Sequence, residues 1–192
     1  MSEKESTEEN AMEYFDIVDE FGNPTGKTIE RTEAHRVGAR HRTAHVWIFR
    51  KKEGNLQILL QKRCQQKDSF PGCYDISSAG HIPAGKDYVE SAIRELKEEL
   101  GLTVLPEELH YVGMQSFFQK GDFHGEDFLD NQVFAVYMLW KDLEENEFAL
   151  QTEEIESVKW MDFEDCMDGV KNHRFPHCIF VEELELLKEH LV

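Results

Sequence analysis

The sequence has few cysteines, no internal repeat, no low-complexity linker and no long apolar run. Without repeats or a linker, the 192 residues give no sign of a second domain, and a hydrophobic content of 40% is enough for one full core. We therefore expect a single domain over residues 12–192, preceded by a disordered acidic tail over residues 1–11. No apolar stretch has the length needed to cross a membrane, which argues against a membrane protein.

The four cysteines form no CxxC pair, and the first residues do not have the pattern of a signal peptide. Reduced thiols in a cytoplasmic protein are the expectation that follows from these two absences.

Positive charge is also scarce, because 21 Lys and Arg stand against 39 Asp and Glu, for a formal net charge of −18. The basic residues are concentrated: residues 27–67 hold eleven Lys or Arg and three Glu. An acidic chain with one basic segment argues against general nucleic-acid binding. It favours a localised basic wall that faces an anionic ligand.

The stretch from Asp87 to Gly101 has the pattern of an amphipathic helix. Asp87 stands three residues before Glu90, an acidic variant of the capping box, and Gly101 supplies a C-terminal stop. Apolar residues recur at helical spacing and predict a face that packs on the core: Val89, Ile93, Leu96 and Leu100.

The same helix carries Arg94, Glu95, Glu98 and Glu99 at spacings that place them close together on its surface. Three mutually repelling carboxylates stabilise a helix poorly. They are well suited to hold a hard divalent cation, which takes carboxylate oxygens and keeps positions for water and substrate phosphates. The pattern therefore predicts a site for phosphoryl chemistry with bound Mg²⁺.

Residues 80–102 resemble the Nudix box, in which a glycine precedes an Arg-Glu-aliphatic-x-Glu-Glu-x-Gly-aliphatic segment. The matching positions are Gly80, Arg94, Glu95, Leu96, Glu98, Glu99, Gly101 and Leu102. Lys86 departs from the pattern, because the family usually has a glutamate there. The resemblance covers about residues 40–165 and implies a MutT-like hydrolase of the Nudix superfamily.

The resemblance implies roles for individual residues. Glu98 and Glu99 would bind the metal directly, together with the backbone carbonyl of Ala79. Glu95 would be a further ligand or the base that activates water, and Arg94 would orient Glu95. The expected ion is Mg²⁺, with Mn²⁺ as an alternative. Many family members place the base on a later loop, and five acids are then candidates: Glu126, Asp127, Asp130, Glu153 and Glu154.

Lys62 and Arg63 end a predicted strand and are candidate clamps for substrate phosphates. His41 and His81 are candidate contacts to substrate or metal. For both pairs, ordinary surface or core positions are the alternative interpretation.

A second resemblance, to type I isopentenyl-diphosphate isomerase, lies in residues 41–49 and 78–81. It implies that His35, His41 and His81 correspond to three histidine ligands of that enzyme. However, Ala79 stands where the isomerase has a catalytic cysteine, and Gln132 stands at its catalytic glutamate. Because neither alanine nor glutamine shuttles protons, the hydrolase is the preferred interpretation.

The Nudix resemblance implies an α/β/α sandwich with a mixed β-sheet, here preceded by an N-terminal β-hairpin. The sequence predicts a hairpin over 13–29, a short helix or loop over 30–40, strands at 45–49, 56–61, 109–119, 131–139 and 157–161, a polar segment over 120–130, and helices over about 162–171 and 178–190.

We expect a small-molecule diphosphate substrate, such as a nucleoside diphosphate derivative, with no nucleic-acid or membrane partner. The alternatives are an isomerase-like protein and a catalytically silent module that senses a ligand or binds a protein. The hairpin also offers an edge for a homodimer, by resemblance to the family.

Overall fold

The computed structural model describes residues 12–67, 69–123 and 126–191, without the side chains of residues 122, 123, 126 and 127. The acidic tail expected over residues 1–11 lies outside this part of the chain. Among the residues that are described, no helix has the length and apolar character to span a membrane.

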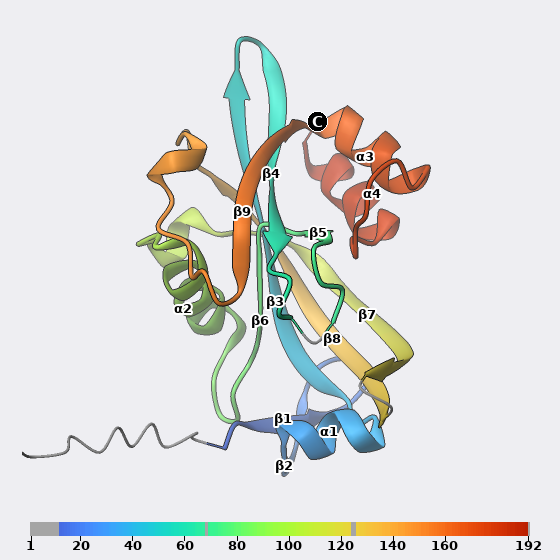
Figure 1. Cartoon of the computed structure of the whole chain (residues 1–192). Helices are drawn as coiled ribbons and strands as arrows, with labels where there is room; N and C mark the ends of the chain where they lie inside the picture. Colours follow the sequence, from blue (N-terminus) through green and yellow to red (C-terminus); the bar gives the residue numbers. More distant parts are fainter. Residues whose placement is uncertain (1–11, 68, 124–125, 192) are drawn as a thin grey trace, which may run out of the picture.

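A seven-stranded mixed sheet forms the centre of the molecule (Figure 1). Its main path runs β5–β4–β3–β8–β7, while β6 pairs with β3 and β9 pairs with β4. β3 and β8 run parallel, and the other pairs are antiparallel. The strands are β3 (His41–Lys52), β4 (Asn55–Arg63), β5 (Tyr74–Asp75), β6 (Ser78–His81), β7 (His110–Phe123), β8 (Glu126–Trp140) and β9 (Ile155–Asp162).

Helices cover both faces of this sheet (Figure 1). α2 (Tyr88–Leu100) packs on one face, whereas α3 (Phe163–Lys171) and α4 (Val181–His190) pack on the other. Two short 3₁₀ helices span Pro106–Glu108 and Glu145–Glu147. The three layers and the mixed sheet confirm the predicted fold class.

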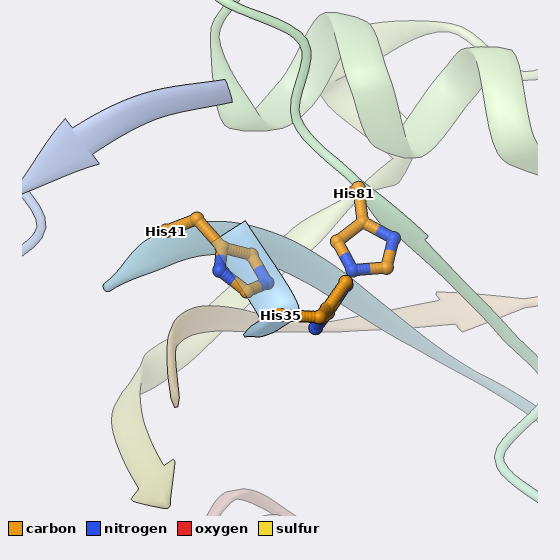
Figure 2. Close-up of side chains that lie close together, drawn as sticks. All are labelled: His35, His41 and His81. Atoms are coloured by element: carbon orange, nitrogen blue, oxygen red, sulfur yellow. The ribbon is translucent and has the colours of Figure 1, made fainter. Parts of the chain in front are cut away.

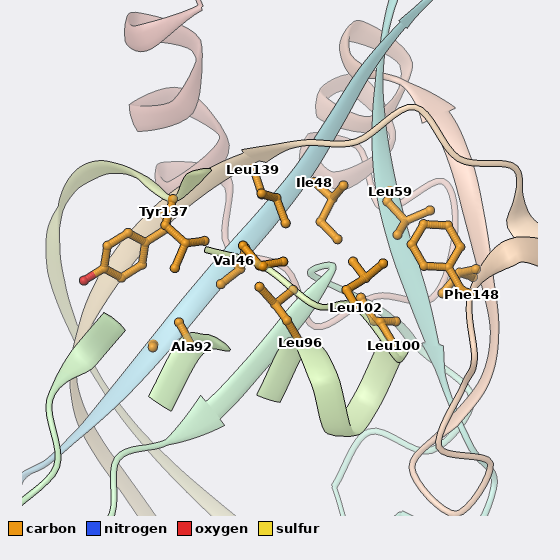
Figure 3. Close-up of a cluster of buried hydrophobic side chains, with 14 of the residues drawn as sticks. Val46, Ile48, Leu59, Ala92, Leu96, Leu100, Leu102, Tyr137, Leu139 and Phe148 are labelled. Carbon is orange, nitrogen blue, oxygen red and sulfur yellow. The ribbon is translucent and has the colours of Figure 1, made fainter. Parts of the chain in front are cut away.

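Successive residues of β3 point to opposite faces of the sheet and contribute to two separate cores. Val46 packs with Leu96 of α2 in the first core (Figure 3). Trp47 packs with Leu184 of α4 in the second. β3 therefore has the nearly continuous buried pattern of a strand covered on both sides.

The predicted N-terminal hairpin is present as β1 (Tyr14–Val18) and β2 (Pro24–Glu30), followed by α1 (Arg31–Val37). These elements lie at one end of the sheet, at the bottom of Figure 1. Phe15 is fully buried there and forms a bridge with Pro83, in the loop that leads to α2. The hairpin therefore covers the end of the sheet that lies next to the loop leading into α2.

The predicted ends of α2 are confirmed. The Asp87 side chain accepts a hydrogen bond from the backbone N–H of Glu90 at 2.7 Å. Gly101 adopts a left-handed conformation with φ of 70°, and its N–H reaches the carbonyls of Leu96 and Lys97. These local contacts fix both ends of the helix that carries the acidic residues.

Several strands are longer than predicted; β3, for example, spans His41–Lys52 rather than 45–49. Two further differences have a structural reason. The polar segment 120–130 was expected to separate two strands, but cross-strand pairing continues through Lys120–Leu129 and Gly121–Phe128. The pairing of two strands rests on backbone hydrogen bonds, so it continues through this polar segment without apolar alternation. The last helix begins at Val181 rather than 178, because the backbone of Cys178 hydrogen-bonds to Tyr74 of β5 and is held extended.

Candidate active site

The acidic residues of α2 lie against β6. Ser78 Oγ donates a hydrogen bond of 2.6 Å to Glu99 Oε2. At Gly80, a Cβ atom would overlap the side chain of Glu95, so that only glycine permits this close approach of strand and helix. The glycine that opens the box motif is thus required by the packing of Glu95.

Arg94 joins two of the three carboxylates. Its guanidinium donates to Glu95 Oε1 at 2.5 Å and to Glu98 Oε2 at 2.8 Å, and it also reaches the backbone carbonyl of His81 at 3.3 Å. Glu98 is half exposed, whereas the Glu95 side chain is 15% exposed and Glu99 is buried. Arg94 therefore orients Glu95 and Glu98, while Glu99 is held separately by Ser78.

Burial changes the acidity of the two inner carboxyl groups. It raises the pKa of Glu99 to about 8, although the hydrogen bond from Ser78 acts in the opposite direction. It also raises the pKa of Glu95 to about 7, against the attraction of Arg94. Glu95 and Glu99 are both desolvated, and only Glu95 has the guanidinium of Arg94 beside it. A divalent cation would supply the missing positive charge.

The carboxylates open onto a cavity of about 1720 Å³. Of the site residues predicted from the sequence, it is lined by Arg63, Ala79, His81, Arg94, Glu95, Glu98 and Glu99. The cavity also extends across the face of the sheet that α4 covers, where Thr43, His45 and Glu183 line it. This volume is above the roughly 300–1,000 Å³ of typical small-molecule pockets, so the cavity has room for an organic ligand together with ions and water.

Lys62 is not among the residues that line the cavity. Its Nζ lies 2.6 Å from Glu156 Oε1, on the other side of β4 from Arg63. Arg63 lines the cavity but is held by Asp75, at 2.9 Å, and by the carbonyl of Ser69. The structure thus brings Arg63 and not Lys62 to the site, because adjacent residues of a strand point to opposite faces.

Three histidines from separate elements, α1, β3 and β6, converge in one place (Figure 2). One nitrogen from each of His35, His41 and His81 lies within 4.8 Å of the others. The carboxylate of Asp130 is 3.9 Å from His35 Nδ1 and 3.7 Å from His41 Nε2. The ring of Phe15 stacks on both His41 and His81 and shields the cluster from water.

The hydrogen-bonding capacity of the three clustered histidines is only partly used by the described residues. His35 Nδ1, His41 Nε2 and His81 Nε2 are buried without a hydrogen-bond partner among the described residues. Burial lowers the pKa of His35 to about 4 and lowers that of His41 and His81 as well. Neutral imidazoles with free nitrogens and a nearby carboxylate are suitable ligands for a transition metal. His41 is fully buried and does not line the cavity, whereas His35 and His81 do.

The two positions that distinguish the isomerase are not proton carriers in this chain. Ala79 follows Ser78 on β6, and Gln132 accepts a hydrogen bond of 2.9 Å from Thr43 Oγ1. The amide of Gln132 also donates to Asp130 at 2.7 Å. Gln132 is therefore engaged as a hydrogen-bond bridge.

The later acids divide into two groups. Asp130, Glu153 and Glu154 line the cavity, and Glu154 is paired with Lys67. The side chains of Glu126 and Asp127 lie outside the described part of the chain. The position of these two as candidate bases is therefore still a prediction.

Sequence reasoning missed the pair His45 and Glu183. Glu183 lies on α4 beside the core residues Leu184 and Leu187, and both it and His45 are buried at the cavity. The one feature of the sequence that could have indicated this pair is that Glu183 stands next to the apolar positions of its helix. Such a residue is usually exposed, so the signal was weak.

The chain matches known proteins over most of its length. The model of the NUDIX domain matches residues 39–180. Nudix hydrolase 3 of Arabidopsis thaliana is 40% identical over 157 residues, which cover 81% of this chain and 20% of that protein. An uncharacterized Nudix hydrolase of Clostridium acetobutylicum is 35% identical over 143 residues, 74% of this chain and 66% of that one. The chain thus spans less than two thirds of the length of each of these two relatives.

Solved structures share the fold. The crystal structure of DR0079 from Deinococcus radiodurans has a TM-score of 0.66 at 19% identity and covers 90% of this chain and 98% of its own. The NUDIX domain of Shewanella oneidensis NrtR, complexed with ADP ribose, has a TM-score of 0.58 at 17% identity, with 80% and 90% covered. The family model spans the sheet, α2 and its carboxylates, and the chain therefore belongs to the NUDIX domain family.

Proposed function

We propose that the chain is a Mg²⁺-dependent hydrolase that cleaves a diphosphate linkage in a small molecule, such as a nucleoside diphosphate derivative. The observation that carries this proposal is the array of Glu95, Glu98 and Glu99 at the edge of the cavity, with Arg94 bonded to Glu95 and Glu98. The names of the relatives support hydrolysis, and the ADP ribose bound by the Shewanella domain supports a ligand with a diphosphate.

The residues present fit the metal. Glu95, Glu98 and Glu99, with the backbone carbonyl of Ala79, are hard oxygen donors that would hold Mg²⁺ or Mn²⁺. When bound, such an ion neutralises phosphate oxygens and makes bound water more acidic. Arg94 keeps Glu95 and Glu98 in place before a substrate enters, so that little rearrangement accompanies binding.

A general base must take the proton of the attacking water. Glu95 is one candidate, since Arg94 fixes its direction at the cavity. Asp130, Glu153 and Glu154 are further candidates, because they also line the cavity. Glu126 and Asp127 stay candidates, since their side chains lie outside the described part of the chain. Single replacements by the corresponding amide separate them: the base is the residue whose loss lowers kcat by about 10²–10⁴-fold while the metal still binds.

Phosphorus NMR with Mg²⁺ tests the proposal directly. The substrates are nucleoside triphosphates, nucleotide sugars, ADP-ribose, NADH, diadenosine polyphosphates and isopentenyl diphosphate. Cleavage of one class, lost in Glu98→Gln, supports the hydrolase, and this variant should fold because Glu98 is half exposed. Ligand binding that Glu98→Gln leaves unchanged, without turnover of any substrate, contradicts it and supports the silent module.

The histidine cluster favours a second candidate, an isomerase-like protein acting on isopentenyl diphosphate. His35, His41 and His81 converge as the resemblance to that enzyme implies, with Asp130 beside them. Ala79 in place of the catalytic cysteine speaks against it. A product with an intact diphosphate and a moved double bond, seen by proton and phosphorus NMR, would favour this candidate over the hydrolase.

A further inference from the structure

A carboxylate from the last helix is buried beneath the central sheet. Glu183 of α4 is fully buried although its side chain is a carboxyl group, and it lies next to the core residue Leu184. Trp47 Nε1 donates a hydrogen bond of 2.5 Å to Glu183 Oε1, and His45 Nδ1 lies 3.1 Å from both carboxylate oxygens. Burial of a carboxylate is costly unless it is hydrogen-bonded and its charge is balanced. The site therefore needs both of these partners.

His45 is the partner that can balance the charge, because Trp47 only donates a hydrogen bond. Nδ1 of His45 is engaged by Glu183, which leaves Nε2 as its other polar atom. The ring of His45 also stacks on Phe134, with 4.2 Å between the centroids, so that its plane is fixed. A carboxylate and an aromatic ring thus hold His45 in one orientation.

This orientation places the ring at the cavity. His45 and Glu183 both line it, and the His45 side chain is 10% exposed whereas that of Glu183 is fully buried. In the sheet, His45 of β3 stands opposite Ala79 of β6, the residue whose carbonyl is a proposed metal ligand. A substrate phosphate near that carbonyl would also be near His45.

The Lys and Arg side chains that line the cavity already have carboxylate partners, including Arg31 with Glu13 and Arg36 with Glu33. Arg63 is held by Asp75, Lys67 by Glu154, and Arg94 by Glu95 and Glu98. The doubly protonated ring of His45 would donate Nδ1–H to Glu183 and present Nε2–H to the cavity, with the carboxylate of Glu183 balancing its charge. Such charge-assisted hydrogen bonds are about twice as strong as neutral ones.

We propose that His45 binds an anionic phosphate oxygen of the substrate through Nε2–H, and that Glu183 is the residue that positions it. The inference rests on the proposed diphosphate hydrolysis and adds a substrate-binding residue on the side of the cavity opposite the acidic helix. His81 and Asp130 also act electrostatically on this region, since both are coupled by charge to His45.

The test uses ¹⁵N-histidine NMR of the full chain with Mg²⁺ and methylenediphosphonate, a diphosphate analogue that resists hydrolysis. The His45 signals are assigned from their absence in His45→Gln. We expect the Nε2 signal of His45 to move on addition of the probe in the unaltered protein. We also expect Glu183→Gln to change the Nδ1 signal and to weaken the probe's Kd, which a purely structural role of a folded variant would not do.

Affinities give the second readout. His45→Gln should weaken the Kd of the probe about tenfold or more, since hydrogen bonds to charged groups contribute that much. Glu183→Gln should weaken it in the same direction, and the double variant should lose no more than His45→Gln alone. The matched control is His110→Gln, the same change at an exposed histidine of β7, and its Kd should stay within about twofold.

The two proposals fail separately. Turnover that is lost in Glu98→Gln, combined with an unmoved Nε2 signal and an unchanged Kd in His45→Gln, would leave the hydrolase standing and overturn the role of His45. A moved signal without turnover of any substrate would support His45 as a phosphate ligand and count against hydrolysis. If His45→Gln does not fold, the His45 signals are assigned through the backbone resonances of the unaltered chain instead, so that the NMR readout still decides.

Discussion

Replacing Glu99 by Gln should stabilise the metal-free protein at alkaline pH. Burial raises the folded-state pKa of Glu99 from 4.5 to about 8, so that the fold favours the neutral carboxyl group. Such a group contributes stability that is complete below pH 4.5 and is lost as pH rises through about 8. At about 1.4 kcal/mol per pH unit, the interval corresponds to a loss of up to roughly 5 kcal/mol. Gln keeps the shape and an acceptor for Ser78 but has no charge to lose.

The assay is urea unfolding of parent and Glu99→Gln in EDTA between pH 5 and pH 9, followed by tryptophan fluorescence. The two free energies of unfolding should be similar near pH 5, and the variant should be more stable by several kcal/mol near pH 9. The histidines of the buried cluster act in the opposite direction at low pH, but they are common to both proteins. Glu98→Gln is the control. Because Glu98 is half exposed, its replacement should not change how the free energy of unfolding depends on pH.

Mg²⁺ should reverse the order of stability of the parent and Glu99→Gln at alkaline pH. A cation needs the ionised carboxylate, so it should stabilise the parent at pH 8–9 and have less effect on Glu99→Gln. Parallel pH profiles of parent and variant in EDTA would refute the reasoning, because they would mean that Glu99 ionises in the fold without cost.

Three further predictions follow from the contacts of single residues. Gly80→Ala should force the side chain of Glu95 away, lower kcat and destabilise the fold by about 1–3 kcal/mol, as kinetics and thermal unfolding would reveal; unchanged kinetics would contradict the packing argument. His35, whose pKa burial lowers to about 4, contributes stability that is present above pH 6.5 and is lost as pH falls toward 4, so His35→Asn should flatten acid unfolding followed by circular dichroism. Arg63→Ala should raise KM, whereas Lys62→Ala, outside the cavity, should leave KM within about twofold; equal effects would show that the cavity assignment of the two is wrong.

Features that depend on neighbouring residues could be predicted from the sequence. The capping contact of Asp87, the stop at Gly101 and the shared surface of Glu95, Glu98 and Glu99 need only the helical repeat. The hairpin likewise follows from a turn between two short strands. In these cases the interacting groups are a few residues apart, and chain geometry alone brings them together.

Features that depend on which face of a strand is covered required the tertiary structure. Lys62 and Arg63 are equivalent in the sequence, yet the strand sends one to Glu156 and the other to the cavity. The length of β7 and β8 was also underestimated, because pairing between two polar strands leaves no apolar alternation to detect.

The sequence by itself determined the acidic helix, its ends and the family to which the chain belongs, because all three are written in local spacing. Only the tertiary structure decided that His35, His41 and His81 share one buried space, and that Glu183 reaches His45 beneath the sheet. Those contacts join residues far apart in the chain. They arise from the order of strands and the packing of α4, which no short-range pattern encodes.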